Sequence, residues 1–134
     1  MMKNAMLELQ YFNVTEISFG LNKSYKSVQE PIEINPLVSR KIVKLDSDTA
    51  AVIIKLEIKN DSNKPFLGHI VLQGTFKCHD WEKTEDSRFL VNETTSAILF
   101  PYLRQTLTQI TSILNVTPYV LPIVNTIELF KNSK

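Results

Sequence analysis

Alternating apolar and polar residues predict four β-strands in the first part of the chain. The alternation runs through residues 7–21, 37–46, 50–59 and 66–78. A period of two is typical of a strand with one buried face. In the first segment the phase changes near Asn13, which predicts a β-bulge. Residues 22–36 hold two prolines and predict a long crossing loop, whereas short turns join the later strands, so we expect an antiparallel sheet with one covered face.

The period changes to that of a helix near the C-terminal third. Apolar residues recur there at steps of three and four, which predicts a helix with one apolar stripe. The stripe consists of Leu99, Leu103, Leu107, Ile110 and Leu114. We expect Ser96 to cap this helix and Pro101 to lie in its first turn, where a missing N–H costs little. The helix should end by Asn115.

The segments beside this helix have other patterns. Residues 79–95 are polar and charged, which predicts a surface connection with a short helix. Prolines at 118 and 122 require an extended chain between them. Residues 123–131 then predict a short final helix, and the whole chain of 134 residues is expected to form one domain.

The outward face of the long helix carries almost no charge. Between Thr94 and Ile127 the only charged residue is Arg104. Around it lie Gln105, Thr108, Thr111 and Ser112, where a solvated helix usually shows pairs of Lys and Glu. This face either packs against a second copy of the chain or is an exposed face of weak helix propensity.

Composition narrows the class of protein. The chain is 43% hydrophobic and 22% charged, which are values of an ordinary globular domain. Its formal net charge of +1 predicts no long-range field that would attract nucleic acid or an anionic membrane. We therefore expect no nucleic-acid partner and no membrane insertion.

Cysteine content and the N-terminus suggest the compartment. Cys78 is the only cysteine, so no intramolecular disulfide can form, which fits a reducing environment. The N-terminal segment MMKNAMLELQYFNV lacks the apolar run and cleavage site of a signal peptide. No uninterrupted apolar run is long enough for a membrane span. These features predict a cytoplasmic location.

Residue types with catalytic or metal-binding chemistry are few. Cys78, His79 and Asp80 are the right types for a nucleophilic site, but neighbours on a strand point to opposite faces. We interpret them as a strand-end thiol and a surface imidazole. Asp46 and Asp48 could contact a cation, but a turn is the better interpretation because no third ligand follows at loop spacing. The sequence thus predicts no enzyme, no metal and no cofactor.

Aromatic residues leave two alternatives open. Trp81, Phe100, Tyr102, Tyr119 and Phe130 either belong to the core or line an apolar groove. Aromatic residues in a proline-containing extended segment are harder to bury fully than those on a helix stripe. We therefore expect some of them to face a cleft.

Several short segments resemble the SecB family of bacterial protein-export chaperones. ILFPYLRQTLTQITS (98–112) is similar to the signature helix of the family. TEISF (15–19) resembles its first strand, and QGTF (73–76) resembles the glycine turn of its fourth strand. PYVLPIVN (118–125), followed by LF (129–130), resembles the segment that leads into its last helix. The resemblance covers roughly residues 7–131.

The resemblance implies a fold and an assembly. The fold would be α+β, with a four-stranded antiparallel sheet and a long crossing loop, covered by one long and one short C-terminal helix. The assembly would be a homotetramer, a dimer of dimers with the long helices at its interface. The residues that would then meet a symmetry mate are Arg104, Gln105, Thr108, Thr111 and Ser112.

The resemblance also implies an activity, namely ATP-independent holding of unfolded or precursor polypeptides in long apolar grooves. Promiscuous binding of this kind needs apolar area with little demand on shape. By carry-over from the family, each groove residue is a candidate that could equally belong to the core. These candidates are Ile32, Ile34, Phe76, Tyr119, Val120, Leu121, Leu129 and Phe130.

Family members that pass clients to the SecA motor use an acidic patch on the exposed sheet face. Glu16 stands at one acidic position and is the candidate translocase contact, whereas Gly20 and His69 stand where acidic residues are expected. The sequence also ends at Lys134 without the acidic tail of the family. These departures put SecA docking in doubt, because complementary charge sets specificity and encounter rate.

Three roles stay open at this point. The first is a general, export-related holdase. The second is a SecB-like chaperone dedicated to one client, such as the antitoxin of a toxin–antitoxin system. The third is a scaffold of the same fold that binds no clients.

Overall fold

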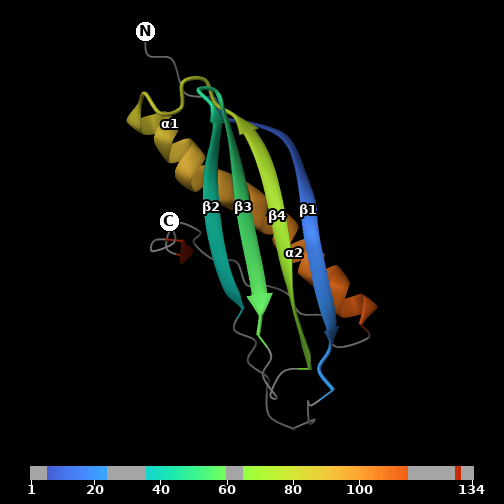
Figure 1. Cartoon of the computed structure of the whole chain (residues 1–134). Coiled ribbons are helices and arrows are strands. Elements are labelled where there is room, and N and C mark those ends of the chain that lie inside the picture. The colour runs from blue at the N-terminus through green and yellow to red at the C-terminus, as the bar shows by residue number, and fades with distance from the viewer. Residues whose placement is uncertain (1–5, 24–35, 60–64, 115–128, 131–134) are drawn as a thin grey trace.

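The computed structural model describes residues 6–23, 36–59, 65–114 and 129–130. These residues contain one antiparallel sheet with the strand order β1-β4-β3-β2 (Figure 1). Its strands are β1 (Glu8–Leu21), β2 (Leu37–Asp46), β3 (Thr49–Ile58) and β4 (Phe66–Lys77). The four predicted strands are confirmed, each to within one residue at either end.

The strand order explains why the sequence carries a long crossing segment. β1 and β2 are consecutive in the chain but lie at opposite edges of the sheet, whereas β2, β3 and β4 are paired in sequence order. β1 has register shifts between Leu9 and Tyr11 and between Val14 and Glu16. The predicted bulge near Asn13 is thus present as two irregularities that flank this residue.

One helical segment crosses a single face of the sheet diagonally (Figure 1). It consists of α1 (Glu85–Phe89), a π-helical turn η1 (Leu90–Thr94) and α2 (Thr95–Ile113). Thr84 caps its start, because the Thr84 side chain accepts a hydrogen bond from the Ser87 N–H at 3.1 Å. The helix ends at Ile113, as expected.

The start of this helix was predicted wrongly. Ser96 is not an N-cap but a buried residue of α2, and Pro101 lies inside α2 rather than in a first turn. The apolar stripe begins only at Leu99. The apolar pattern therefore did not indicate that the helical segment already starts at Glu85, in more polar sequence. The stripe itself is confirmed: Leu99, Leu103 and Leu107 are buried, and Ile110 and Leu114 pack against the core.

The core lies between α2 and the inner face of the sheet. It contains Val52, Ile54, Leu56 and Ile58 of β3 together with Phe66, Ile70, Leu72 and Phe76 of β4. Gly74 of β4 allows α2 to approach the strand closely, because a Cβ atom there would lie 2.8 Å from Leu99 Cδ2. No helix among the described residues has the length and apolar character needed to cross a membrane.

A buried arginine joins the edge strand β2 to the helix. The Arg40 side chain is only 7% exposed, and its Nη1 donates to the Asn92 carbonyl within the π-helical turn. The same nitrogen lies 3.3 Å from Ser96 Oγ and 3.5 Å from the Glu93 carboxylate. A π-helical turn disturbs the regular ladder of helix hydrogen bonds, so a donor from the sheet stabilises it.

Replacing Gly74 by Ala should destabilise the fold by about 1–3 kcal/mol, because the new methyl group would overpack the contact with Leu99. Gly20→Ala is the matched control, since a Cβ atom at Gly20 would meet nothing within 4 Å. Urea denaturation of both variants measures the difference. Equal midpoints would show that α2 can move away from β4 at no cost.

Candidate functional site

Three of the eight predicted groove residues lie in the described part of the chain. Phe76 is fully buried and Phe130 is 1% exposed, and both belong to the core cluster. The sequence left open whether these residues line a groove or belong to the core, and both belong to the core. Leu129 is 38% exposed and is the one described candidate with free apolar surface. The other five, Ile32, Ile34, Tyr119, Val120 and Leu121, lie outside the described residues.

The positively charged side chain of Arg40 holds Phe130 against β2. The guanidinium carbon of Arg40 lies 5.0 Å from the centroid of the Phe130 ring, which is within the range of a cation–π interaction. The bonds from Arg40 to Asn92 and Ser96 fix the guanidinium group independently of Phe130. Arg40 is not among the predicted site residues, although it shares the phase of Val38 and Ile42, which pack against the core on the covered face.

The outward face of α2 is only partly available for contact. Gln105 and Ser112 are exposed, and Arg104 and Thr108 are half-buried. Thr111 was placed on this face by the sequence analysis, but it is buried, and its Oγ1 donates to the Leu107 carbonyl at 3.1 Å. The prediction for Thr111 is therefore corrected, because its angular position lies closer to the apolar stripe than to the outward face.

Hydroxyl groups on α2 bond mainly to the helix itself. Thr108 Oγ1 lies 3.0 Å from the Arg104 carbonyl, and Ser112 Oγ lies 3.0 Å from the Thr108 carbonyl. Such side chains need no partner from outside the helix. Arg104 differs from them, because its Nε is buried and has no hydrogen-bond partner among the described residues.

Exposed apolar side chains lie on both edge strands, β1 and β2, and at the ends of α1 and α2. Tyr11, Ile17 and Leu21 of β1 are exposed, and Ile113 is 82% exposed. β1 pairs with β4 on one side, and at the sheet edge its other side has no neighbouring strand among the described residues. An edge strand with exposed apolar side chains is a template for pairing with another chain.

Charges of both signs share the outer face of the sheet. Glu16 Oε1 lies 2.8 Å from His69 Nε2, so the candidate translocase contact is already paired within the chain. The cross-strand register puts Lys41, Lys55 and Glu57 on the same face. An acidic patch does not form from these residues.

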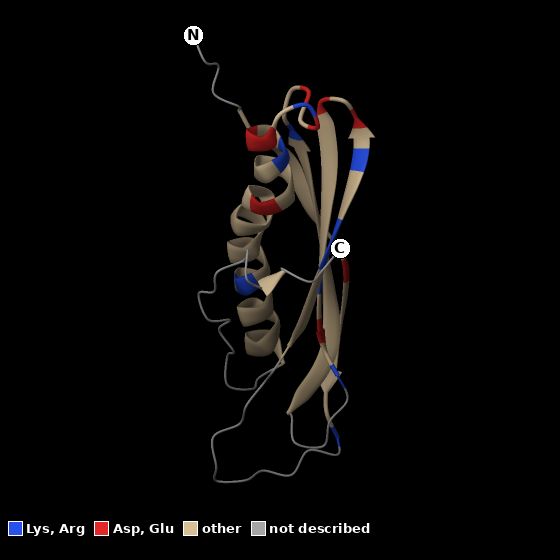
Figure 2. Cartoon of the chain, turned by 90° about the vertical axis from the view of Figure 1, so that its left-hand side faces the viewer, with Lys and Arg blue, Asp and Glu red and all other residues tan. Residues whose placement is uncertain are grey.

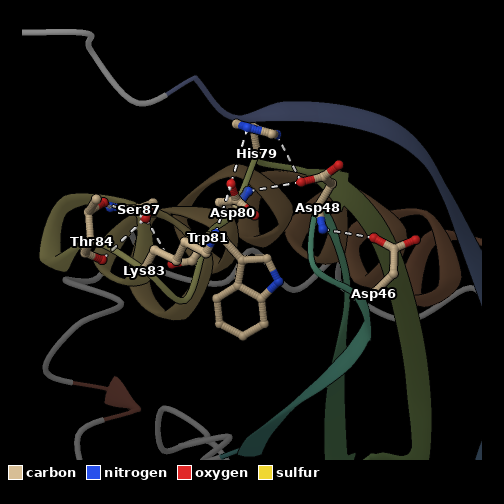
Figure 3. A network of polar contacts seen from close by, with 8 residues as sticks. All are labelled: Asp46, Asp48, His79, Asp80, Trp81, Lys83, Thr84 and Ser87. Atoms are coloured by element: carbon tan, nitrogen blue, oxygen red, sulfur yellow. Dashed lines mark hydrogen bonds and ion pairs between the residues drawn. The ribbon is translucent and has the colours of Figure 1, made fainter.

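The residues Cys78, His79 and Asp80 do not form a nucleophilic site. Cys78 is buried, and burial raises the pKa of its thiol, whereas His79 is 83% exposed. The thiol and the imidazole thus lie on opposite sides of the strand end, as the sequence predicted. His79 and Asp80 instead meet Asp48, a contact that the sequence pattern did not indicate (Figure 3).

Comparisons with known proteins agree with this architecture. A solved structure of the SecB-like chaperone Rv1957 from Mycobacterium tuberculosis, in complex with a ChAD peptide from the Rv1956 HigA1 antitoxin, is similar with a TM-score of 0.71 and 14% identity. The match covers 88% of this chain and 90% of that chain. A protein of unknown function from Streptococcus agalactiae is similar with a TM-score of 0.52 and 13% identity, over 89% of this chain and 98% of that one.

No curated protein sequence matches the chain. A family model, "SecB: Preprotein translocase subunit SecB", matches residues 2–134. The α+β fold agrees with that of the SecB-like chaperone structure. Because the family model spans nearly the whole chain, the protein belongs to the SecB family.

Proposed function

We propose that this protein is an ATP-independent chaperone that holds unfolded or precursor polypeptides. The observation that carries this proposal is the match of the SecB family model to residues 2–134. Exposed apolar side chains at Leu129, Ile113 and along β1 supply surface for extended clients. The role needs no catalytic residues, and a cytoplasmic location fits the single reduced cysteine, Cys78.

The client groove that we propose is lined by Leu129 together with Ile32, Ile34 and Tyr119–Leu121. The sequence is the basis for the five residues other than Leu129, which lie outside the described residues. Leu129 is supported by its partial exposure, directly beside the buried Phe130. Phe76 and Phe130 then form the floor beneath such a groove rather than its open surface.

We propose that copies of the chain assemble into a homotetramer through the outward face of α2. α2 is almost free of charged residues, whereas charges gather around α1 and the strand ends nearest to it (Figure 2). A second copy that packs on this face would meet one charged side chain of α2, the half-buried Arg104. The exposed amide of Gln105 can pair across such an interface without desolvating a charge.

One observation favours a more specialised second function. The similar Mycobacterium tuberculosis chaperone was solved with a peptide from an antitoxin. The pairing of Glu16 with His69 and the mixed charges on the outer face weaken the case for docking to SecA. A chaperone dedicated to one client, such as an antitoxin, is therefore our second candidate.

The test of holding activity uses stoichiometric protein without nucleotide and a chemically unfolded, slow-folding polypeptide. Gel filtration should show a complex with the mass of a tetramer plus client, because apolar surface captures the client before it folds. Several unrelated clients distinguish a general holdase from a dedicated one. Failure to bind any of them would leave a scaffold, or a chaperone with a single partner, as the better function.

Leu129→Asp should weaken client binding by about fivefold, which corresponds to the loss of ~1 kcal/mol of apolar contact. Its melting temperature should stay near that of the unchanged protein, because the side chain is partly exposed. Phe130→Ala is the contrasting variant and should lose about 3–5 kcal/mol of stability, since its ring is buried. Binding by Leu129→Asp equal to that of the unchanged protein would remove Leu129 from the groove.

The assembly is tested by adding two charges to α2, in the double variant Gln105→Glu and Thr108→Glu. Light scattering should show dimers in place of tetramers, because like charges would meet across the symmetric interface. The control adds two charges on and beside β2, as Ser39→Glu and Ser47→Glu, and should leave the mass unchanged. A tetramer in both double variants would place the interface elsewhere.

A further inference from the structure

Three side chains that can ligate a metal converge at one end of the sheet (Figure 3). Asp48 comes from the turn between β2 and β3, whereas His79 and Asp80 follow the end of β4. Asp48 Oδ1 lies 3.0 Å from His79 Nδ1, and Asp80 Oδ2 lies 3.2 Å from His79 Nε2. One ligand atom from each residue lies within 4.8 Å of the other two.

We propose that Asp48, His79 and Asp80 form a binding site for a divalent transition-metal ion, with Zn²⁺ as the best fit. An imidazole with two carboxylates is a donor set that Zn²⁺ accepts, whereas Ca²⁺ and Mg²⁺ prefer oxygen ligands alone. Bonds of about 2.0–2.2 Å to a tetrahedral ion place the ligand atoms about 3.3–3.6 Å apart. The two carboxylates face different nitrogens of the His79 ring, so an ion bound to one nitrogen requires a rotation of this exposed side chain that brings both carboxylates to the same nitrogen.

The backbone around the site is fixed without help from His79. The Cys78 N–H donates to the Asp48 carbonyl at 2.7 Å, and the Trp81 N–H donates to the Ser47 carbonyl at 3.2 Å. Asp48 Oδ1 accepts the Asp80 N–H at 2.9 Å, and the Asp48 N–H donates to Asp46 Oδ1 at 2.8 Å. These bonds hold the turn against the connection to α1, so the two carboxylates stay close to each other.

If these polar contacts served only to stabilise the turn, they would account for the presence of Asp48 but not for that of His79. The His79 ring takes no part in the backbone bonds and lies 83% exposed between the two carboxylates. Both ring nitrogens therefore lie beside oxygen ligands, at the open side of the site. The side chain adds a metal ligand at the position where the turn itself requires none.

The charges at the site favour a cation. Asp48 and Asp80 place two carboxylates beside the His79 ring, and their negative charges attract a cation. Lys83 Nζ lies 3.5 Å from Asp80 Oδ2 and is the competing cation. Its side chain is 74% exposed, so a doubly charged ion can replace it at little cost.

A bound ion would join the turn between β2 and β3 to the connection that enters α1. Because these segments are close only in the folded chain, the ion would bind the folded state and raise its melting temperature. This inference does not depend on the proposed chaperone function.

The experiment uses the full chain without an affinity tag. Calorimetric titration with ZnCl₂ measures binding, and thermal unfolding with and without ZnCl₂ measures the change in melting temperature. We expect one ion per chain and a rise of several degrees in the melting temperature. His79→Ala and Asp80→Asn should each weaken binding at least ~10-fold. Asp48→Asn should do the same while it keeps the oxygen that accepts the Asp80 N–H.

Matched controls separate this site from the other soft ligands of the chain. His69→Ala removes the second histidine, and Cys78→Ala removes the buried thiol; both variants should bind Zn²⁺ as the unchanged protein does. Co²⁺ bound at the site should show no thiolate charge-transfer absorption. The proposal is overturned by the absence of saturable binding, by full affinity in His79→Ala, or by loss of binding in either control.

Discussion

The contact between α2 and the inner face of β4 is the constraint on which the rest of the structure depends. Leu99, Leu103 and Leu107 enter the core in one row, and Gly74 lets the first of them approach the strand directly. A helix packed this closely covers the middle of one sheet face and commits its apolar stripe there. The outer sheet face, the β1 edge and the outward side of α2 remain as surface, and these are the surfaces on which a SecB-family protein can assemble or bind.

A second anchor makes the helix cross the sheet in one position. Arg40 bonds to the π-helical turn and to Ser96 and also stacks on Phe130, so one side chain connects β2, the helix and the C-terminal region. A nearly buried guanidinium group is tolerated because carbonyl, hydroxyl and carboxylate oxygens surround it. The same anchor keeps Phe130 in the core and leaves its neighbour Leu129 partly exposed. The buried Phe130 is thus adjacent in sequence to Leu129, which we propose lines the client groove.

The ends of the sheet differ in chemistry from its middle. Near α1, backbone bonds from Cys78 and Trp81 close the β2–β3 turn against the start of the helix, and polar side chains gather around them. Along the outer face, Glu16 contacts His69 and lies on the same face as Lys41 and Lys55, so the acidic patch expected of a SecA-docking surface does not form from these residues. The chain therefore has the fold of the SecB family but a mixed charge distribution on its outer sheet face. This charge distribution, rather than the fold, bears on which candidate partner the chain can bind.

The sequence by itself determined the strands, the stripe of α2 and the family. Each of these is a local property, since a period of two or 3.6 residues and short motifs need only neighbouring positions. The tertiary structure alone decided that Phe76, Phe130 and Thr111 are buried, that Arg40 anchors the helix, and that Pro101 lies within α2. It also brought His79 and Asp80 to Asp48. These outcomes depend on which segments pack together although they are far apart in the sequence. The alternation of residue types is a local pattern and does not indicate which distant segments will meet.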